Sequence, residues 1–438
     1  MQDPIDLGLL SYMQAECLFE QYYERLNPVI LLLDPILHHL DQVRERSKPL
    51  LTAILGVTAR FRSPDIASRC FDHLDIILSR AVFAGESDIH LIQALLLAIY
   101  WRTPGDKSSW TKTGIAVRMA QGLGLHNCFS QKFTDKFSDP RGLLNLQRTW
   151  LCVVCFDRSF SHVFRLPRAI QSDYHAESLG WLEYEPSIHI PSDCQLALNL
   201  NLVPITDFLY AATEEDQSDA SAVQLLQKAD DLLVSQEKFW FSAQNLPPTS
   251  RYIAAIMFSL AHSVVRWYAL RKSGDSPSAR TRFLAAASNV ADNISAAADA
   301  ELLHLWFDAG VTNVSDIGLC LFKLFDVERK DCRTILSSLH RLQYAFRHPN
   351  LDTELSFTSV SRFFGRLVDR AESLLAKKRH GVSPIAASHF QSGHSDYNMP
   401  GITHFESILR DWDTADSEQY LVESTPSGGS NDASGSVP

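Results

Sequence analysis

The sequence predicts an all-α protein: a large multi-helix domain followed by a disordered C-terminal tail. Three observations lead to this prediction. Apolar residues recur at i, i+3, i+4 and i+7 over most of the first 380 residues, which is the period of a helix buried on one face. We find neither an Asn-Gly or Asp-Gly hairpin turn nor a sustained alternating run. Gly and Pro punctuate the chain between the periodic segments. We therefore expect one helical domain over residues 1–380, with essentially no sheet.

The predicted helices fall into two blocks, separated by a polar segment at 171–194. The first block comprises 9–26, 50–61, 66–83, 89–101, 108–123 and 143–162. The second comprises 221–240, 252–271, 279–307, 314–325, 334–345 and 360–377. Breaker sequences precede several of them: Thr103-Pro104-Gly105 before 108–123, Asp139-Pro140 before 143–162, Leu246-Pro247-Pro248 before 252–271, and 273–277 before 279–307.

The tail, residues 381–438, changes to Ser, Gly, Asp, Asn and Pro, and we expect it to be disordered. Its segment 405–424 holds six acidic residues and one arginine. Apolar side chains are interleaved with these acids: Phe405, Ile408, Leu409, Trp412, Tyr420 and Leu421. Such alternation is typical of an activation segment that folds onto a coactivator groove. An amphipathic helix that docks back on the domain is an equally open alternative.

Composition and charge exclude several classes of protein. The fraction of charged residues, 21%, is ordinary for a soluble protein, and the net charge of −11 argues against a free-standing nucleic-acid binder. The N-terminus lacks the basic start and apolar run of a signal peptide. The longest apolar runs, such as 94–101, are far shorter than the roughly 20 residues that cross a bilayer. We expect an intracellular protein without a membrane partner.

The chain carries no motif for catalysis or metal binding. Cys152 and Cys155 have zinc-ligand spacing, but no second pair follows and both lie in a helical pattern. Asp230-Asp231 lacks the third acid of a terpenoid synthase, and Ala297 stands where that class of enzyme needs a hydroxyl ligand. We find no phosphate-binding loop, H-E-x-x-H or G-x-S-x-G. We therefore predict no enzymatic activity, bound metal or cofactor for this chain.

The segment SSWTKTGIAVRMAQGLGLHNC, residues 108–128, is either the wall of an active site or a packing seam. Its small residues Gly114, Ala116 and Ala120 would let helices approach closely, and Gly124 suits the left-handed position that ends a helix. His126 is then a residue at a helix end that interacts with the last carbonyls. These features favour the packing seam.

Two blocks of the chain resemble the fungal-specific transcription factor domain, the regulatory region of fungal zinc-cluster activators. The first block, 95–126, resembles the family signature at Trp110, Gly114, Arg118, Gly124 and His126. The second block, 147–170, is similar in order and spacing, and its matching residues are Arg148, Trp150, Asp157, Arg158, Ser161 and Pro167. The resemblance covers about 18–175 and implies a structural role for these residues.

The resemblance implies a nuclear regulator of metabolic or secondary-metabolite genes transcribed by RNA polymerase II. Coactivators or other regulators, a second copy of the chain and a small-molecule effector are the partners it implies. In the family, zinc and DNA contact belong to a six-cysteine module, which these residues do not contain. A co-regulator or dominant-negative partner that does not itself bind DNA is the alternative, and an all-α enzyme is a remote one. Lys377-Lys378-Arg379 is a candidate nuclear import signal or a complement to the helix dipole.

Asp157 is the most constrained of the signature residues. It shares a helix face with Trp150, Val154 and Ser161, which predicts that it points into the core. A buried carboxylate needs a partner, and we expect Arg118 first and Arg168 second to supply the cation. The alternative places Asp157 at the solvent edge of the helix, with Arg158 directed inward by its aliphatic stem.

Overall fold

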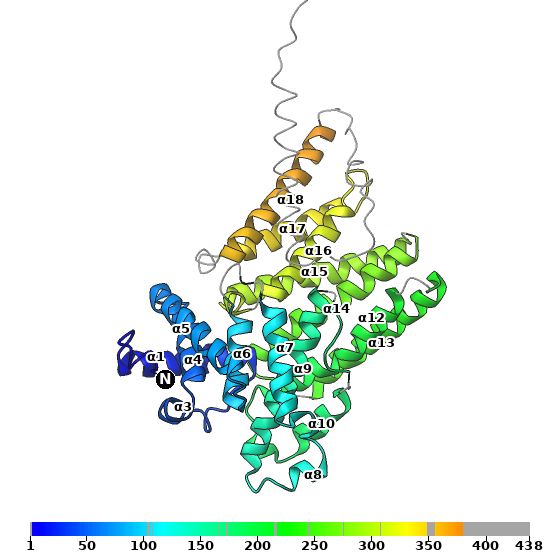
Figure 1. The fold of residues 1–438 in the computed structure, drawn as a ribbon. Helices are drawn as coiled ribbons and strands as arrows, with labels where there is room; N and C mark the ends of the chain where they lie inside the picture. The colour runs from blue at the N-terminus through cyan, green and yellow to red at the C-terminus, as the bar shows by residue number, and fades with distance from the viewer. Residues whose placement is uncertain are drawn as a thin grey trace, which may run out of the picture. The chain divides into compact units, whose positions relative to one another are not determined.

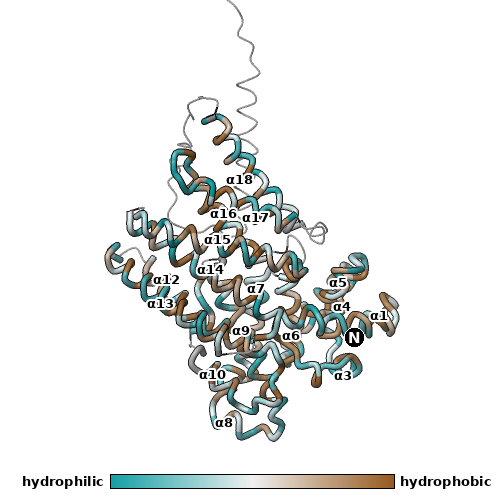
Figure 2. The backbone as a smooth tube through the Cα atoms, turned by 180° about the vertical axis from the view of Figure 1, so that it is seen from behind, coloured by the Kyte–Doolittle hydropathy of each residue, from teal (hydrophilic) through white to brown (hydrophobic). Residues whose placement is uncertain are grey.

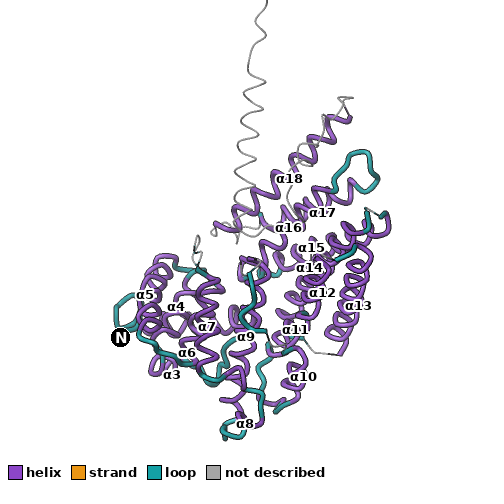
Figure 3. Tube along the Cα trace, turned by 45° about the vertical axis from the view of Figure 1, so that its right-hand side comes forward, coloured by secondary structure: helices purple, strands orange, loops and turns teal. Residues whose placement is uncertain are grey.

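The computed structural model describes residues 2–102, 106, 108–164, 166–171, 174–213, 217–243, 246–274, 276–306, 308–347 and 355–379. Over these residues all regular structure is helical and no strand occurs, which confirms the predicted fold class (Figure 1; Figure 3). The predicted tail, 381–438, and its acidic segment 405–424 lie outside the described residues. The domain boundary at residue 380 stays a prediction.

The N-terminal segment predicted as a helix over 9–26 is helical from Tyr12 to Ile30, with a π-helical turn inside it. It consists of α1 (Tyr12–Gln21), a π-helical turn (Tyr22–Leu26) and α2 (Asn27–Ile30). Ser11 and Gln14 form a capping box that starts α1. Pro28, which cannot donate a backbone hydrogen bond, lies in the first turn of α2. The helical backbone therefore continues through the π-helical turn and ends after Ile30, where Leu31 takes a left-handed φ of 66°.

Two helices, α4 (Lys48–Ala59) and α6 (Ile89–Tyr100), form the centre of the N-terminal half. Residues 50–59 of α4 and 91–99 of α6 are buried on every side of the helix. The helices packed around them are α3 (Leu40–Arg46), α5 (Pro64–Phe83), α7 (Ser109–Gly122) and α9 (Pro140–Phe164), with the short α8 (Gln131–Thr134) between α7 and α9. Because α4 and α6 contact neighbours all round, they carry continuous apolar runs rather than a stripe.

The C-terminal half is a succession of helices in which neighbours in sequence pack together. It comprises α10 (His175–Glu183), α11 (Asp193–Asn201), α12 (Val203–Thr213), α13 (Asp219–Ala243), α14 (Pro248–Lys272), α15 (Pro277–Asp299), α16 (Asp308–Lys323), α17 (Cys332–Phe346) and α18 (Leu355–Arg379). Contacts run from α12 through α13 and α14 to α15, and then through α17 to α18. In Figure 2 short apolar and polar runs alternate along the outer helices, as amphipathic helices require.

Several helices differ from the prediction. Helices α10, α11 and α12 occupy 175–213, where the prediction had a polar separator up to 194 and no helix before 221. Short helices with weak periodicity give little sequence signal. Helix α15 ends at Asp299 rather than at 307, because Glu301 takes a left-handed φ of 55° before a 3₁₀ turn, Leu303–Leu305.

Helix α14 qualifies the prediction about membrane segments. Among the described residues it is the one helix that is long and apolar enough to cross a bilayer, with a mean hydropathy of 1.4 in its best window. Over half of that window, 56%, is buried inside the fold. Since α13 and α15 pack against it, α14 has the surroundings of a core helix.

Candidate functional site

The signature segment forms the helix α7 and the turn that ends it. Ala116 and Ala120 are fully buried, and α7 packs between α6 and α9, as expected of a packing seam. Gly124 has a φ of 77°, the left-handed conformation predicted for it. The prediction for Gly114 is wrong: this residue is half-buried, and a Cβ added there would have no neighbour within 4 Å. Of the three small residues, only Ala116 and Ala120 are therefore fully buried in the seam.

The two signature blocks meet around Trp150, which is fully buried. Its ring lies edge-on to Tyr174, with 5.6 Å between ring centroids, and to His126, with 6.4 Å. The Tyr174 hydroxyl donates to the main-chain oxygen of His126 at 3.1 Å. His126 itself is exposed, and burial raises the pKa of the nearby Cys128 thiol, so that thiol stays protonated. This part of the chain is a packed junction without an activated nucleophile.

Arg148 of α9 makes the best-formed buried ion pair of the signature. Its Nε and Nη2 donate to the two carboxylate oxygens of Asp193 at 2.6 and 2.8 Å. The side chains of Arg148 and Asp193 are 0% and 1% exposed. Asp193 starts α11, so this fork-to-fork pair joins the long signature helix to the segment that precedes the second half.

His189 completes this buried cluster from the loop before α11. Its Nδ1 lies 2.6 Å from Asp193, and its Nε2 lies 3.0 Å from the carbonyl oxygens of Trp181 and Tyr184. Burial alone would raise the pKa of Asp193, but the charge and hydrogen bond of Arg148 outweigh it and lower that pKa. Asp193 and His189 were not among the residues predicted from the sequence. The available signal was an acid at the first turn of a helix, after Pro191-Ser192.

Asp157 is buried as predicted, with 1% exposure, but the predicted cation is wrong. Its carboxylate accepts the backbone N–H groups of Ala169, at 3.1 Å, and Ile170, at 2.9 Å. Arg118 is exposed and donates to Gln121, whereas Arg168 pairs with Asp207. Backbone donors thus replace the expected arginine, and the contact holds the chain after α9 against that helix.

The remaining signature residues are spread between core and surface. Trp110 is half-buried and packs against the N-terminal core, while Arg158 and Ser161 are buried at 8% and 1% exposure. Pro167 is exposed in the segment after α9. These positions support α7 and α9 from several sides and do not converge on one pocket.

A polar cavity lies elsewhere, between α13, α14 and α15. Its volume is about 350 Å³, within the range of small-molecule sites. The polar side chains that line it are those of Glu237, Ser259, His262, Arg266, Asn289, Asp292 and Asn293. None of these residues was predicted as a site residue from the sequence.

Two residues that line this cavity, His262 and Arg266, also belong to an ion-pair network centred on the buried Asp230. Asp230 accepts from His262 at 2.9 Å and from Arg266 at 3.0 Å, and it also pairs with Arg282. Burial alone would raise the pKa of Asp230, but the hydrogen bond of His262 and the charge of Arg266 lower it to about 2. Burial would lower the pKa of His262, but its hydrogen bonds to Asp230 and Glu237 raise it.

The described residues contain no group of three or more His, Cys, Asp or Glu side chains placed to hold a metal ion. Cys152 is buried and donates its S–H to the carbonyl oxygen of Leu31 at 3.5 Å. Burial also raises the pKa of both Cys152 and Cys155, which disfavours the thiolate that zinc requires. This pair therefore has the surroundings of packed apolar side chains.

Comparison with known proteins adds a family and a fold. Protein priB of Lentinula edodes is 28% identical over 210 residues, which are 46% of this chain and 34% of that protein. The transcriptional activator of proteases prtT of Emericella nidulans is 27% identical over 223 residues, 50% of this chain and 32% of that protein. Cutinase transcription factor 1 beta of Fusarium vanettenii is 31% identical over 130 residues, 27% of this chain and 14% of that protein. The matched part of this chain spans about a third of the first two relatives.

A solved structure, "Structure of the K. lactis CBF3 core", shares the fold with a TM-score of 0.58 at 13% identity, covering 94% of this chain and 90% of that one. The model of the "Fungal specific transcription factor domain" matches residues 19–182, a range that includes α7 and α9 and both signature blocks. Residues 19–182 of this chain are therefore a fungal specific transcription factor domain.

Proposed function

We propose that this chain is the regulatory part of a fungal transcription factor that controls metabolic or secondary-metabolite genes transcribed by RNA polymerase II. The observation that carries the proposal is the family match over 19–182, which spans both signature blocks. The names of two relatives, an activator of proteases and a cutinase transcription factor, support a regulator of genes for metabolic enzymes. Because such genes are transcribed in the nucleus, the proposal includes a nuclear location for the protein.

The site geometry supports a scaffold rather than a catalyst. Trp150, Arg148 and Asp157 direct their polar and aromatic groups at other parts of the fold, namely a tyrosine ring, a buried carboxylate and two backbone N–H groups. These contacts fix the relative positions of α7, α9 and the segments after α9. On this proposal the domain presents surfaces to other proteins and carries out no reaction.

Transcription activation is assigned to the acidic segment 405–424 of the sequence. The test fuses residues 1–438 to a heterologous DNA-binding domain and measures transcription of a reporter gene. We expect reporter output above that of the DNA-binding domain alone, and a loss of most of that gain when Leu409 and Trp412 are both changed to Ala. The matched control changes Ser417 and Ser424 to Ala in the same segment. Output equal to background from the whole fusion would contradict activation.

We assign the polar cavity between α13, α14 and α15 to a small effector with several hydrogen-bonding groups. Both charge signs and two amides line it, a combination that suits a polar metabolite rather than an apolar one. The test is a thermal-shift series with the common amino acids and sugars as probes. One of them should raise the melting temperature of the wild type and not that of Asn293→Leu. Equal shifts for both proteins, or none across the series, would refute this assignment.

Two features bear on how the protein reaches DNA and the nucleus. If the full transcript encodes a six-cysteine cluster upstream of Met1, the protein binds DNA directly, whereas a transcript without one favours the co-regulator. Lys377-Lys378-Arg379 ends α18, and Lys378 binds Glu328 at 2.9 Å, so part of this motif also has a structural contact. A fluorescent fusion with all three residues changed to Ala tests nuclear import.

A further inference from the structure

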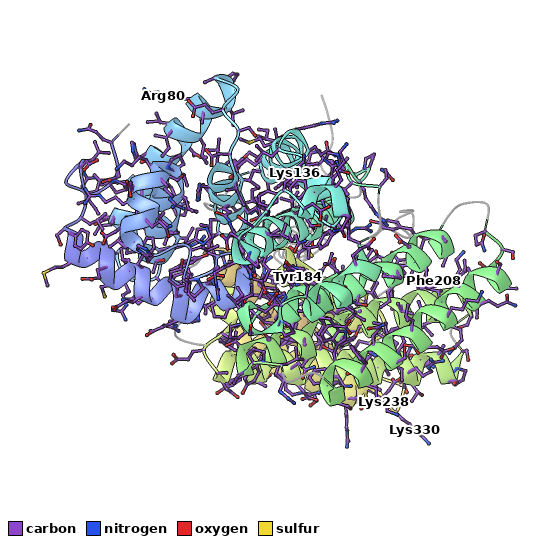
Figure 4. The ribbon with its side chains drawn as sticks, turned by 90° about the horizontal axis from the view of Figure 1, so that it is seen from below. Arg80, Lys136, Tyr184, Phe208, Lys238 and Lys330 are labelled. Carbon is purple, nitrogen blue, oxygen red and sulfur yellow. The ribbon has the colours of Figure 1, made fainter. Side chains whose placement is uncertain are left out.

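Helix α5 has one face in the core and one face against which no other described helix packs. Its inner residues, which include Cys70, Leu74 and Leu78, are buried, and α5 packs mainly against α4. Figures 1 and 3 both show α5 at an edge of the N-terminal helices, and Figure 4 shows Arg80 projecting there. The outer face carries Phe83, which at 93% is the most exposed large hydrophobic side chain of the described residues, and Ile76, which is 50% exposed.

The outer face of α5 has a symmetric order of charges and apolar groups around Ile76. Asp72 lies four residues before Ile76 and Arg80 four residues after it, while Arg69 lies seven before and Phe83 seven after. Steps of four and seven residues keep all five side chains on one side of the helix. All five are exposed, and within the described part of the chain Arg69, Asp72 and Arg80 form no ion pair.

We propose that two copies of this chain associate through α5, with the two helices antiparallel about a two-fold axis at Ile76. In that arrangement Ile76 meets its own copy, and Asp72 faces the partner's Arg80 on both sides of the axis. Arg69 lies over the ring of the partner's Phe83, a cation–π contact. The same patch serves both subunits, which is the definition of an isologous interface.

The order of the charges indicates that the partner of this face is a second copy of α5. When the face pairs with its own copy, each Asp72 meets the Arg80 of the other helix, so both charges lie opposite a charge of the other sign. The contact is small: a helix of this length is roughly 30 Å long, and one face of it buries less than the ~800 Å² per partner of a stable complex. We expect a dissociation constant on the order of 10–100 µM.

This dimer rests on the proposed function, in which the domain presents surfaces to other proteins, but its test needs no promoter or reporter. Sedimentation equilibrium of the whole chain at concentrations from about 1 to 200 µM, which bracket that constant, should show a monomer–dimer equilibrium. Phe83→Ser should weaken it at least about tenfold, because the substitution removes an exposed aromatic contact on both sides of the axis. Asp72→Arg and Arg80→Asp should each weaken it, and the double variant should restore it because both ion pairs re-form with exchanged signs. Met13→Ser, at a residue 79% exposed on α1, is the matched control and should change nothing.

Crosslinking tests the position of the axis. In a background with the exposed Cys17 changed to Ser, Ile76→Cys should form a disulfide-linked dimer with copper phenanthroline, because position 76 meets itself. Ser68→Cys, on the same exposed face but away from the axis, should not crosslink. A monomer at all concentrations overturns the proposal. A dimer that Phe83→Ser and the charge reversals leave intact also overturns it. Binding of α5 to a different protein, with no self-association, overturns it as well.

Discussion

Replacement of Arg148 by Ala should destabilise the fold more than any other single arginine change considered in this protein. Arg148 is fully buried, and its two nitrogens lie 2.6 and 2.8 Å from the oxygens of Asp193, whose side chain is 1% exposed. The substitution leaves that carboxylate buried without its main cation. Breaking a buried pair costs about 3–5 kcal/mol. Since His189 remains at 2.6 Å from Asp193, we expect a loss near the lower limit, about 3 kcal/mol.

The assay is urea unfolding followed by tryptophan fluorescence, with the free energy taken from the midpoint and slope. The matched control is Arg168→Ala, which breaks an arginine–aspartate pair whose side chains are 22% and 44% exposed. Exposed pairs contribute about 0–1 kcal/mol, so this variant should stay near the wild type. A double variant, Arg148→Met with Asp193→Leu, removes both charges and should recover most of the stability lost in Arg148→Ala.

The reasoning is refuted if Arg148→Ala lies within about 1 kcal/mol of the wild type, the range of an exposed pair. It is also refuted if the control costs as much as Arg148→Ala. Either result would mean that burial does not decide the contribution of these pairs. A double variant no more stable than Arg148→Ala would show that side-chain packing, rather than the unpaired carboxylate, dominates the loss.

Three more outcomes check other parts of the account. Asp157→Leu should lower the free energy of unfolding in urea by about 1–3 kcal/mol, because two buried N–H groups lose their acceptor. Asp157→Asn keeps an acceptor oxygen and should lower it less. Equal losses for the two variants would contradict this contact. Gly124→Ala should cost about 1–2 kcal/mol because its φ is 77°, and an unchanged midpoint would show that the turn relaxes. The pKa of His262 is raised on folding, so its contribution is complete below the unfolded value of 6.5 and is lost as the pH rises through the folded value. The melting temperatures of wild type and His262→Gln should therefore differ more at acidic than at alkaline pH, and a constant gap would contradict the raised pKa.

Local patterns gave correct predictions where one helix or one turn decides the outcome. The 3.6-residue period correctly predicted α7, α9 and the burial of Asp157. Glycine readily adopts a left-handed backbone, which correctly predicted Gly124 at the end of α7. The small size of glycine also led to the prediction of a close helix contact at Gly114, but a Cβ added there has no neighbour within 4 Å. Small size permits a close approach without requiring one.

Long-range partners could not be predicted in the same way. The donors to Asp157 are backbone groups at 169 and 170, and every residue of a chain has such groups, so no residue type marks them. Asp193 lies 45 residues after Arg148 in a segment whose periodicity was too weak to indicate a helix. The cavity on α13, α14 and α15 arises only when three amphipathic helices pack with polar residues facing one another. Each of these features depends on tertiary packing.

Chromatin immunoprecipitation of the tagged chain, combined with transcript profiling of a strain that lacks its gene, tests directly whether the protein regulates transcription. We expect the chain to be enriched at promoters of RNA polymerase II genes, and transcripts from those genes to change when the gene is deleted. Enrichment is expected whether the chain binds DNA itself or is held there by a partner. Absence of the chain from promoters, together with an unchanged transcript profile, would contradict its role as a transcription regulator.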